Sequence, residues 1–175
     1  MICLIAAILL SLERIAYVWV SRCPESFHVV CQDRLGGILG QPTAAIRRLF
    51  YVFKVLQVST FVSWCYYFGR GSWVSVRWSL VPLTIGAMLA IIGQLLNFGV
   101  FYRLGSLGVF YGNRFGYEVP WCREFPFSLF NHPQYIGALA SIWGFFIAMR
   151  FPSHDWYLLP GLETVYYSIG AWLES

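Results

Sequence analysis

The stretch Trp78–Tyr102, WSLVPLTIGAMLAIIGQLLNFGVFY, contains no charged residue. It is longer than the about 20 residues that an α-helix needs to cross the hydrocarbon core of a bilayer. This stretch therefore predicts a membrane-spanning helix, and it sets the fold class expected for the rest of the chain.

The composition of the whole chain agrees with a membrane protein. Of its 175 residues, 58% are hydrophobic and 11% are charged, whereas about 25% of the residues in a soluble domain are charged. Aromatic residues reach 19%, as expected where rings gather at the two membrane interfaces. No linker rich in Pro, Gly or Ser divides the chain, so we expect a single all-α integral membrane domain over residues 1–175.

Other apolar segments flank the central one, and together they predict a bundle of about five transmembrane helices, with four helices as the alternative. Lys54 interrupts one segment, and we expect its long side chain to reach the membrane surface. Glu163 lies within another and needs a buried partner such as an Arg or a Tyr. The first segment lacks the features of a cleaved secretory signal, so we expect it to be retained. The expected spans cover residues 1–20, 49–69, 78–102, 133–151 and 156–173.

The distribution of arginines predicts the orientation in the membrane. Loops rich in Lys and Arg face the cytoplasm. We therefore expect an external N-terminus, and a cytoplasmic C-terminus on the same side as Asn131 and His132. The loops after the first and third spans hold Arg22, Arg34, Arg47, Arg48, Arg103, Arg114 and Arg123, against Arg70, Arg77 and Arg150 in the others.

The cysteines do not indicate a disulfide framework or a metal site. Cys3, Cys23, Cys31, Cys65 and Cys122 are odd in number and show no CxxC spacing, so we expect reduced thiols and no bound metal. Basic and aromatic residues are not interleaved as on a nucleic-acid-binding surface, so we expect no nucleic-acid partner.

Polar residues gather at the start of the fourth expected span, in Phe125–Gly137, FPFSLFNHPQYIG. Asn131 and His132 are typical of helix starts, and Pro133 suits the first helical position because it has no N–H to satisfy. Polar groups beside a membrane helix are costly unless the protein uses them. His132 has two interpretations, a capping or hydrogen-bonded side chain and a catalytic base.

A second candidate element is the glycine-rich stretch Leu104–Gly116, LGSLGVFYGNRFG. The glycines are denser here than helix packing requires, which favours a backbone-rich surface beside a ligand. No strand precedes them, so they do not indicate a soluble dinucleotide-binding fold.

These two elements resemble those of the phosphatidylethanolamine N-methyltransferases. The blocks that carry the resemblance keep the family's order and spacing over about residues 78 to 175. They are Gly93-Gln94-Leu95-Leu96-Asn97, Leu104–Gly116, Phe125-Pro126-Phe127, Asn131–Gly137 and the terminal Trp172-Leu173-Glu174-Ser175.

The resemblance implies S-adenosylmethionine as the methyl donor and a phospholipid amine as the acceptor. A cofactor site on the cytoplasmic side would use Gly93, Gly105, Gly108, Asn131, Pro133, Tyr135, Gly137 and Glu174. His132 or Glu124 could accept the proton of the acceptor ammonium. Arg103, Arg114 or Arg123 could pair with the phosphodiester, and Tyr111, Tyr117 or Trp121 could hold a quaternary ammonium through their ring faces.

The chain departs from the family pattern at two positions. Ile91 replaces the first glycine of a Gly-x-Gly element, and Ser175 stands where a second terminal acid is usual. Both departures bear on cofactor affinity. The family occurs in the endoplasmic reticulum of eukaryotes and in some bacteria, so the expected membrane is the endoplasmic reticulum or the bacterial inner membrane according to source.

Three other functions remain open at the level of sequence. The start of the fourth span also resembles methyltransferases of prenylcysteine carboxylates and sterol reductases that use NADPH. The glycine-rich stretch favours the phospholipid branch, and a reductase would need a larger cofactor site than so short a chain readily supplies. A membrane scaffold would tolerate substitution of Gly108, Tyr135 and Glu174.

Overall fold

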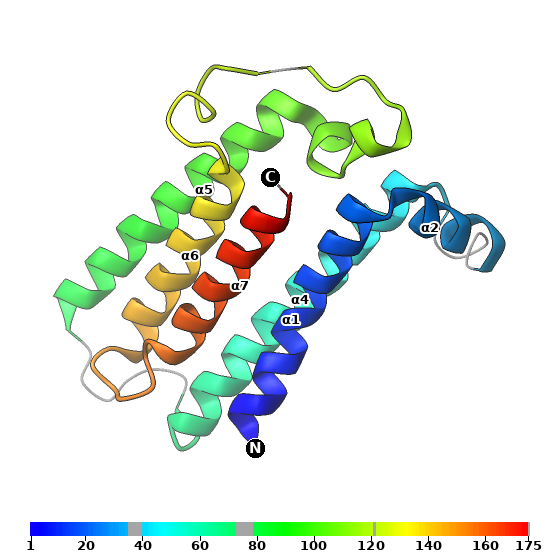
Figure 1. Ribbon diagram of the computed structural model, residues 1–175. Coiled ribbons are helices and arrows are strands. Elements are labelled where there is room, and N and C mark those ends of the chain that lie inside the picture. The colour runs from blue at the N-terminus through cyan, green and yellow to red at the C-terminus, as the bar shows by residue number, and fades with distance from the viewer. Residues whose placement is uncertain (35–39, 73–78, 121, 175) are drawn as a thin grey trace.

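The computed structural model describes residues 1–34, 40–72, 79–120 and 122–174, and these residues form helices joined by loops (Figure 1). No strand occurs among them, so the predicted all-α class is confirmed. The elements are α1 (Ile2–Arg22), α2 (Pro24–Val29), the π-helical turn η1 (Val30–Arg34), α4 (Pro42–Phe68), α5 (Leu80–Val109), the 3₁₀ turn η2 (Gly112–Phe115), α6 (Pro133–Arg150) and α7 (Leu158–Glu174).

Each expected span coincides with one long helix. Three of these helices, α1, α4 and α5, are long and apolar enough to cross a membrane by length and composition. Two boundaries differ from expectation. Helix α4 starts at Pro42 because proline suits the first turn, and α5 continues past a break at Gly105, where the backbone has a φ of 63°. Five crossings, with α6 and α7 included, remain a prediction.

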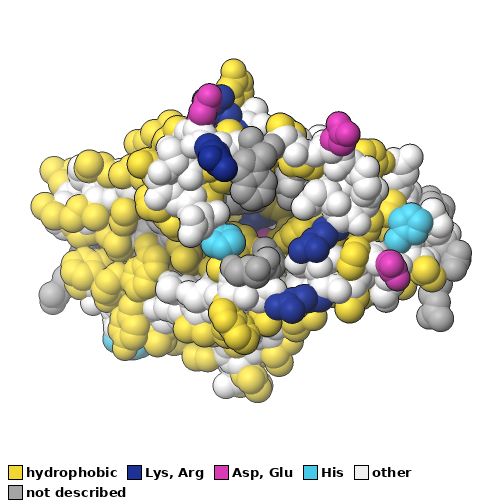
Figure 2. Space-filling view, turned by 45° about the horizontal axis from the view of Figure 1, so that its top comes forward, with side chains coloured by type: hydrophobic (Ala, Val, Ile, Leu, Met, Phe, Trp, Pro, Cys, Tyr) yellow, Lys and Arg dark blue, Asp and Glu magenta, His cyan; other side chains and the backbone are white. Residues whose placement is uncertain are grey.

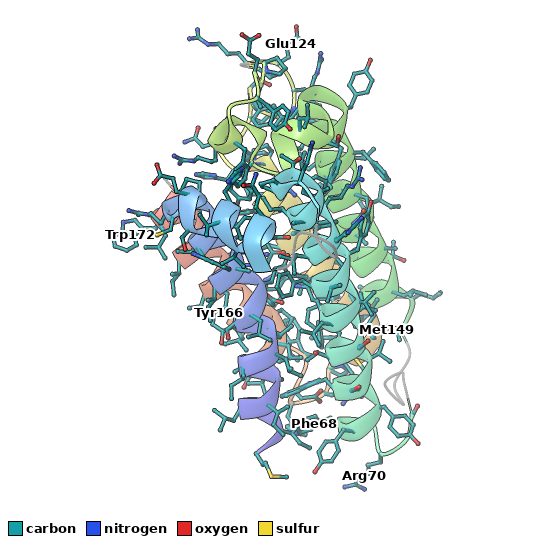
Figure 3. The ribbon with its side chains drawn as sticks, turned by 90° about the vertical axis from the view of Figure 1, so that its right-hand side faces the viewer. Phe68, Arg70, Glu124, Met149, Tyr166 and Trp172 are labelled. Atoms are coloured by element: carbon teal, nitrogen blue, oxygen red, sulfur yellow. The ribbon has the colours of Figure 1, made fainter. Side chains whose placement is uncertain are left out.

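The five long helices alternate in direction, so the chain has two distinct ends (Figure 1). One end carries the C-terminus, α2 and the loop that joins α5 to α6, and Glu124 lies there (Figure 3). The opposite end carries the N-terminus and the loop from α6 to α7, and Arg70 lies there (Figure 3). The start of α6 and the end of the chain therefore share one end, as expected.

Helices α5 and α6 pack closely through glycines. A Cβ atom built on Gly86 would meet the carbonyl oxygen of Gly144, and one built on Gly93 would meet that of Gly137. Small residues allow such close approach between membrane helices. This contact fixes the start of α6 against the end of α5.

Two apolar clusters form the core, and they lie toward opposite ends of α1. One contains Ala6 and Leu10, and the other contains Tyr17 and Val20. Glu13 and Arg14 lie between them on the same helix, and both are buried. Charged residues in this position need partners from neighbouring helices.

Candidate functional site

Residues from two separate sequence elements meet at the start of α6. A hollow of about 170 Å³ is lined by Gly108 and Tyr111 from the glycine-rich stretch, and by Asn131, His132, Pro133 and Tyr135 from the other. The structure therefore brings together six of the residues predicted from sequence.

Local geometry explains the start of α6. Pro133 occupies the first turn, and His132 stands at the cap position without a capping hydrogen bond from its side chain. Instead the backbone carbonyl of His132 accepts the N–H groups of Tyr135 and Ile136. The His132 ring stacks on the Tyr135 ring, with a centroid distance of 5.8 Å and an interplanar angle of 18°. The His132 side chain therefore makes no capping hydrogen bond here, and the choice between a hydrogen-bonded side chain and a catalytic base stays a prediction.

A larger cavity of about 570 Å³ adjoins this hollow, because Gln134 and Tyr135 line both. Helices α1, α4, α5, α6 and α7 all contribute to its lining. Figure 2 shows a hollow near the centre of one face of the molecule, with acidic and basic side chains visible inside it. A volume of several hundred Å³ suits a small-molecule ligand.

A cluster of charged and polar side chains lies along this cavity. Glu13 Oε1 is 2.9 Å from Arg14 Nη2 and 3.1 Å from Lys54 Nζ. Lys54 Nζ also donates to Gln57 Oε1 at 3.0 Å, and Gln57 Nε2 donates to Glu163 Oε1 at 2.6 Å. Helices α1, α4 and α7 are thus joined by one polar network.

Two expectations about buried charge have different outcomes. Glu163 has a buried partner as expected, although the partner is the amide of Gln57. The expectation that Lys54 reaches the membrane surface is wrong. Its ammonium turns inward, because the carboxylate of Glu13 offers it a direct ionic partner.

Three tyrosines surround the guanidinium of Arg14. Its Cζ atom lies 3.9 Å from the ring centroid of Tyr167, 5.2 Å from that of Tyr17 and 5.5 Å from that of Tyr135. Such contacts are favourable when the cation is removed from water. They connect α1 with α6 and α7 beside the cavity.

Several buried polar atoms next to the cavity have no hydrogen-bond partner. These are Arg14 Nε and Nη1, the Tyr17 hydroxyl, Asn97 Oδ1 and Glu13 Oε1, of which Glu13 Oε1 has the two ionic contacts given above. Buried polar groups in proteins are usually paired. Unpaired donors and acceptors at a cavity are therefore available to a ligand.

Other predicted residues lie away from these two hollows. Glu124 pairs with Arg103, and its side chain is exposed. Tyr117 donates its hydroxyl to Gln41 Oε1 at 3.3 Å. Arg114 and Arg123 are exposed. None of these five residues lines the small hollow or the large cavity.

Of the remaining predicted residues, three are glycines that shape the backbone, and two are not described by the structure in full. Gly93 and Gly137 face each other across the contact between α5 and α6, and Gly105 forms the break in α5. Trp121 and the side chain of Glu174 lie outside the described residues.

Tyr135 apart, sequence reasoning did not select the charged residues of the cavity or the tyrosine that α7 contributes. Glu13, Arg14, Lys54 and Tyr167 come from helices that precede or follow the quoted motifs. The available signal was charge within an apolar segment, at Glu13, Arg14 and Lys54. That signal marks a functional position but does not identify its partners.

Comparison with known proteins gives two matches. The model of the phospholipid methyltransferase family matches residues 81–174. The phosphatidyl-N-methylethanolamine N-methyltransferase of Arabidopsis thaliana is 33% identical over 139 residues, which cover 79% of this chain and 75% of that protein. No solved structure matches the chain. The matched residues include the glycine-rich stretch and the start of α6.

Proposed function

Because the chain belongs to the phospholipid methyltransferase family, we propose that it transfers a methyl group from S-adenosylmethionine to the amine of phosphatidylethanolamine. The mono- and dimethyl derivatives would serve as further acceptors, towards phosphatidylcholine. The main support is the small hollow, where the two motifs that resemble the family meet. The relative's printed name indicates that it acts on the monomethyl lipid, which makes that lipid the first acceptor to test.

The residues present fit such a cofactor. The ligand carries a sulfonium, a zwitterionic amino acid and an adenosine, so it needs polar atoms, aromatic faces and nearby negative charge. The two hollows offer the unpartnered Asn97 Oδ1 and Tyr17 hydroxyl, and the rings of Tyr135 and Tyr167, whose faces suit a cation. When bound, S-adenosylmethionine supplies an electrophilic methyl group.

The start of α6 would hold the cofactor. Asn131, Pro133 and Tyr135 line the small hollow together with Gly108. Gly93 and Gly137 would contribute indirectly. Their close contact sets the position of the start of α6, without contact to the cofactor.

The acceptor amine must lose a proton before it can react, because an ammonium has no lone pair. His132 lines the hollow beside Tyr135, whereas Glu124 pairs with Arg103. Of the two predicted proton acceptors, His132 is the better placed. The rest of the catalysis would come from positioning of the amine.

The acyl chains of the lipid would occupy the apolar part of the larger cavity. Phe98 on α5 and Val58 on α4 line it and are also exposed on the molecular surface, by 69% and 57%. The cavity therefore adjoins the apolar outer surface of the bundle.

The proposed function is tested by label transfer. Purified protein is incubated with methyl-labelled S-adenosylmethionine and liposomes of phosphatidylethanolamine or its monomethyl form. We expect label in the lipid fraction. Prenylcysteine and sterol acceptors, the latter with NADPH, serve as parallel tests of the other functions. Absence of label from both phospholipids, in detergent and in liposomes, would refute the proposal.

The base role of His132 is tested by His132→Gln. We expect the turnover number to fall by about a hundredfold, which is typical of the loss of a general base. Binding of S-adenosylhomocysteine should change little. His28, which lines neither hollow, provides the matched control, and His28→Gln should retain activity. Full turnover of His132→Gln across pH would exclude the base role.

A further inference from the structure

Arg14 has hydrogen-bonding capacity that the protein itself does not use. Its residue is 7% exposed, and its Nε and Nη1 atoms have no hydrogen-bond partner, although Nη2 contacts Glu13. The side chain lines the larger cavity. Leaving such donors unpaired is unfavourable, so an arginine in this position indicates a ligand that pairs with them.

The charges beside the cavity favour an anion. Arg14 and Lys54 are the cations among the described lining residues, and Glu13 is the acid. Glu13 contacts both cations through the same oxygen. Glu163 lies behind Gln57 and does not line the cavity. The lining therefore carries one formal positive charge more than negative.

The surroundings of Arg14 hold its guanidinium in place. Tyr17, Tyr135 and Tyr167 contact it as aromatic neighbours, while Glu13 binds one of its nitrogens. A guanidinium fixed in this way can donate charge-assisted hydrogen bonds from Nε and Nη1 to the oxygens of a carboxylate or phosphate.

We propose that Arg14, assisted by Lys54, is an oxyanion-binding site within the cavity. Its ligand is the phosphodiester of the lipid acceptor or the carboxylate of the methyl donor, which share this chemistry. The inference rests on the proposed function. It concerns helices α1 and α4, which lie outside the residues matched by the family model.

The test measures two dissociation constants in neutral detergent by calorimetry. One probe is S-adenosylhomocysteine, which has the carboxylate but no phosphate. The other is dihexanoyl phosphatidyl-N-methylethanolamine, which has the phosphodiester. The variants are Arg14→Gln, Arg14→Lys and the control Arg47→Gln, which removes an exposed arginine of α4. Glu13 keeps Lys54 as partner in Arg14→Gln, so this variant leaves no unpaired buried acid.

We expect Arg14→Gln to weaken one probe by about tenfold or more, as the loss of a charged hydrogen bond implies. If the affinity for S-adenosylhomocysteine falls, the site binds the carboxylate of the methyl donor. If the affinity for the lipid falls, the site binds the phosphodiester. Arg14→Lys should recover part of the affinity, and Arg47→Gln should bind as wild type.

The proposal is overturned if Arg14→Gln binds both probes within twofold of wild type. It is also overturned if Arg14→Lys binds no better than Arg14→Gln, since a general structural defect would affect both alike. These binding measurements are independent of label transfer. Wild-type protein that binds both probes but transfers no methyl group would refute the proposed function alone.

Discussion

Glu13 pairs with two cations, the buried Arg14 and the partly exposed Lys54. It lies 2.9 Å from Arg14 and 3.1 Å from Lys54, and it is 5% exposed. This acid neutralises one cation and also separates two. Without it, the positive charges of Arg14 and Lys54 would lie close together with no acid between them. The stability of α1 against α4 and the charge of the cavity are therefore linked through one side chain.

We expect Glu13→Gln to lower the free energy of unfolding by about 3 kcal/mol, as is usual when one partner of a buried ion pair is removed. The measurement is a thermal or denaturant unfolding curve in detergent. Exposed Glu25 on α2 is the matched control, and Glu25→Gln should leave stability nearly unchanged. A second change, Lys54→Met, should restore part of the stability lost in Glu13→Gln. Equal stability of Glu13→Gln and Glu25→Gln would contradict this account.

At the scale of elements, apolar length predicts helices better than it predicts their partners. The uncharged run 78–102 identifies α5. It does not predict that the helix continues through a break at Gly105 and ends at Val109. The motif at Asn131–Gly137 marks the start of α6 because proline and short polar residues have local preferences. The contact of Glu13 with Lys54 is not local, since it depends on which helices become neighbours.

The contact between α5 and α6 gives a prediction that separates packing from ligand binding. We expect Gly93→Ala to lower the free energy of unfolding by about 1 to 3 kcal/mol, because its methyl group would overlap the backbone of Gly137. Gly161 on α7 has open space around its Cα, so Gly161→Ala is the control and should be neutral or stabilising. Unfolding curves of the two variants are compared with calorimetry of S-adenosylhomocysteine. Wild-type stability of Gly93→Ala with weakened binding would favour a direct cofactor role for Gly93.

At the scale of the whole molecule, the small hollow lies at the end that carries the start of α6, and a cluster of paired charges lies at the opposite end. At that opposite end Arg150 donates to both oxygens of Asp155, and the Trp64 indole donates to the same carboxylate. These groups are buried and pair with one another. Nearer the middle of the bundle, buried donors beside the larger cavity remain unpaired. The buried polar groups therefore differ along the bundle in whether they are paired, and hydropathy alone does not predict this difference.

The number of membrane crossings is the last feature to test, because α6 and α7 share the bundle with three helices that are long and apolar enough to cross a membrane. We expect five crossings, with the cavity end in the cytoplasm. In a variant without native cysteines, a single cysteine at exposed Ser128 should react with a membrane-impermeant maleimide only from the cytoplasmic side. One at exposed His154 should react only from the opposite side, as should one at Arg70. If α6 and α7 lay on the cytoplasmic surface instead, the cysteine at position 154 would react from the same side as the one at position 128. Shared sidedness of those two positions would therefore reduce the count to three crossings.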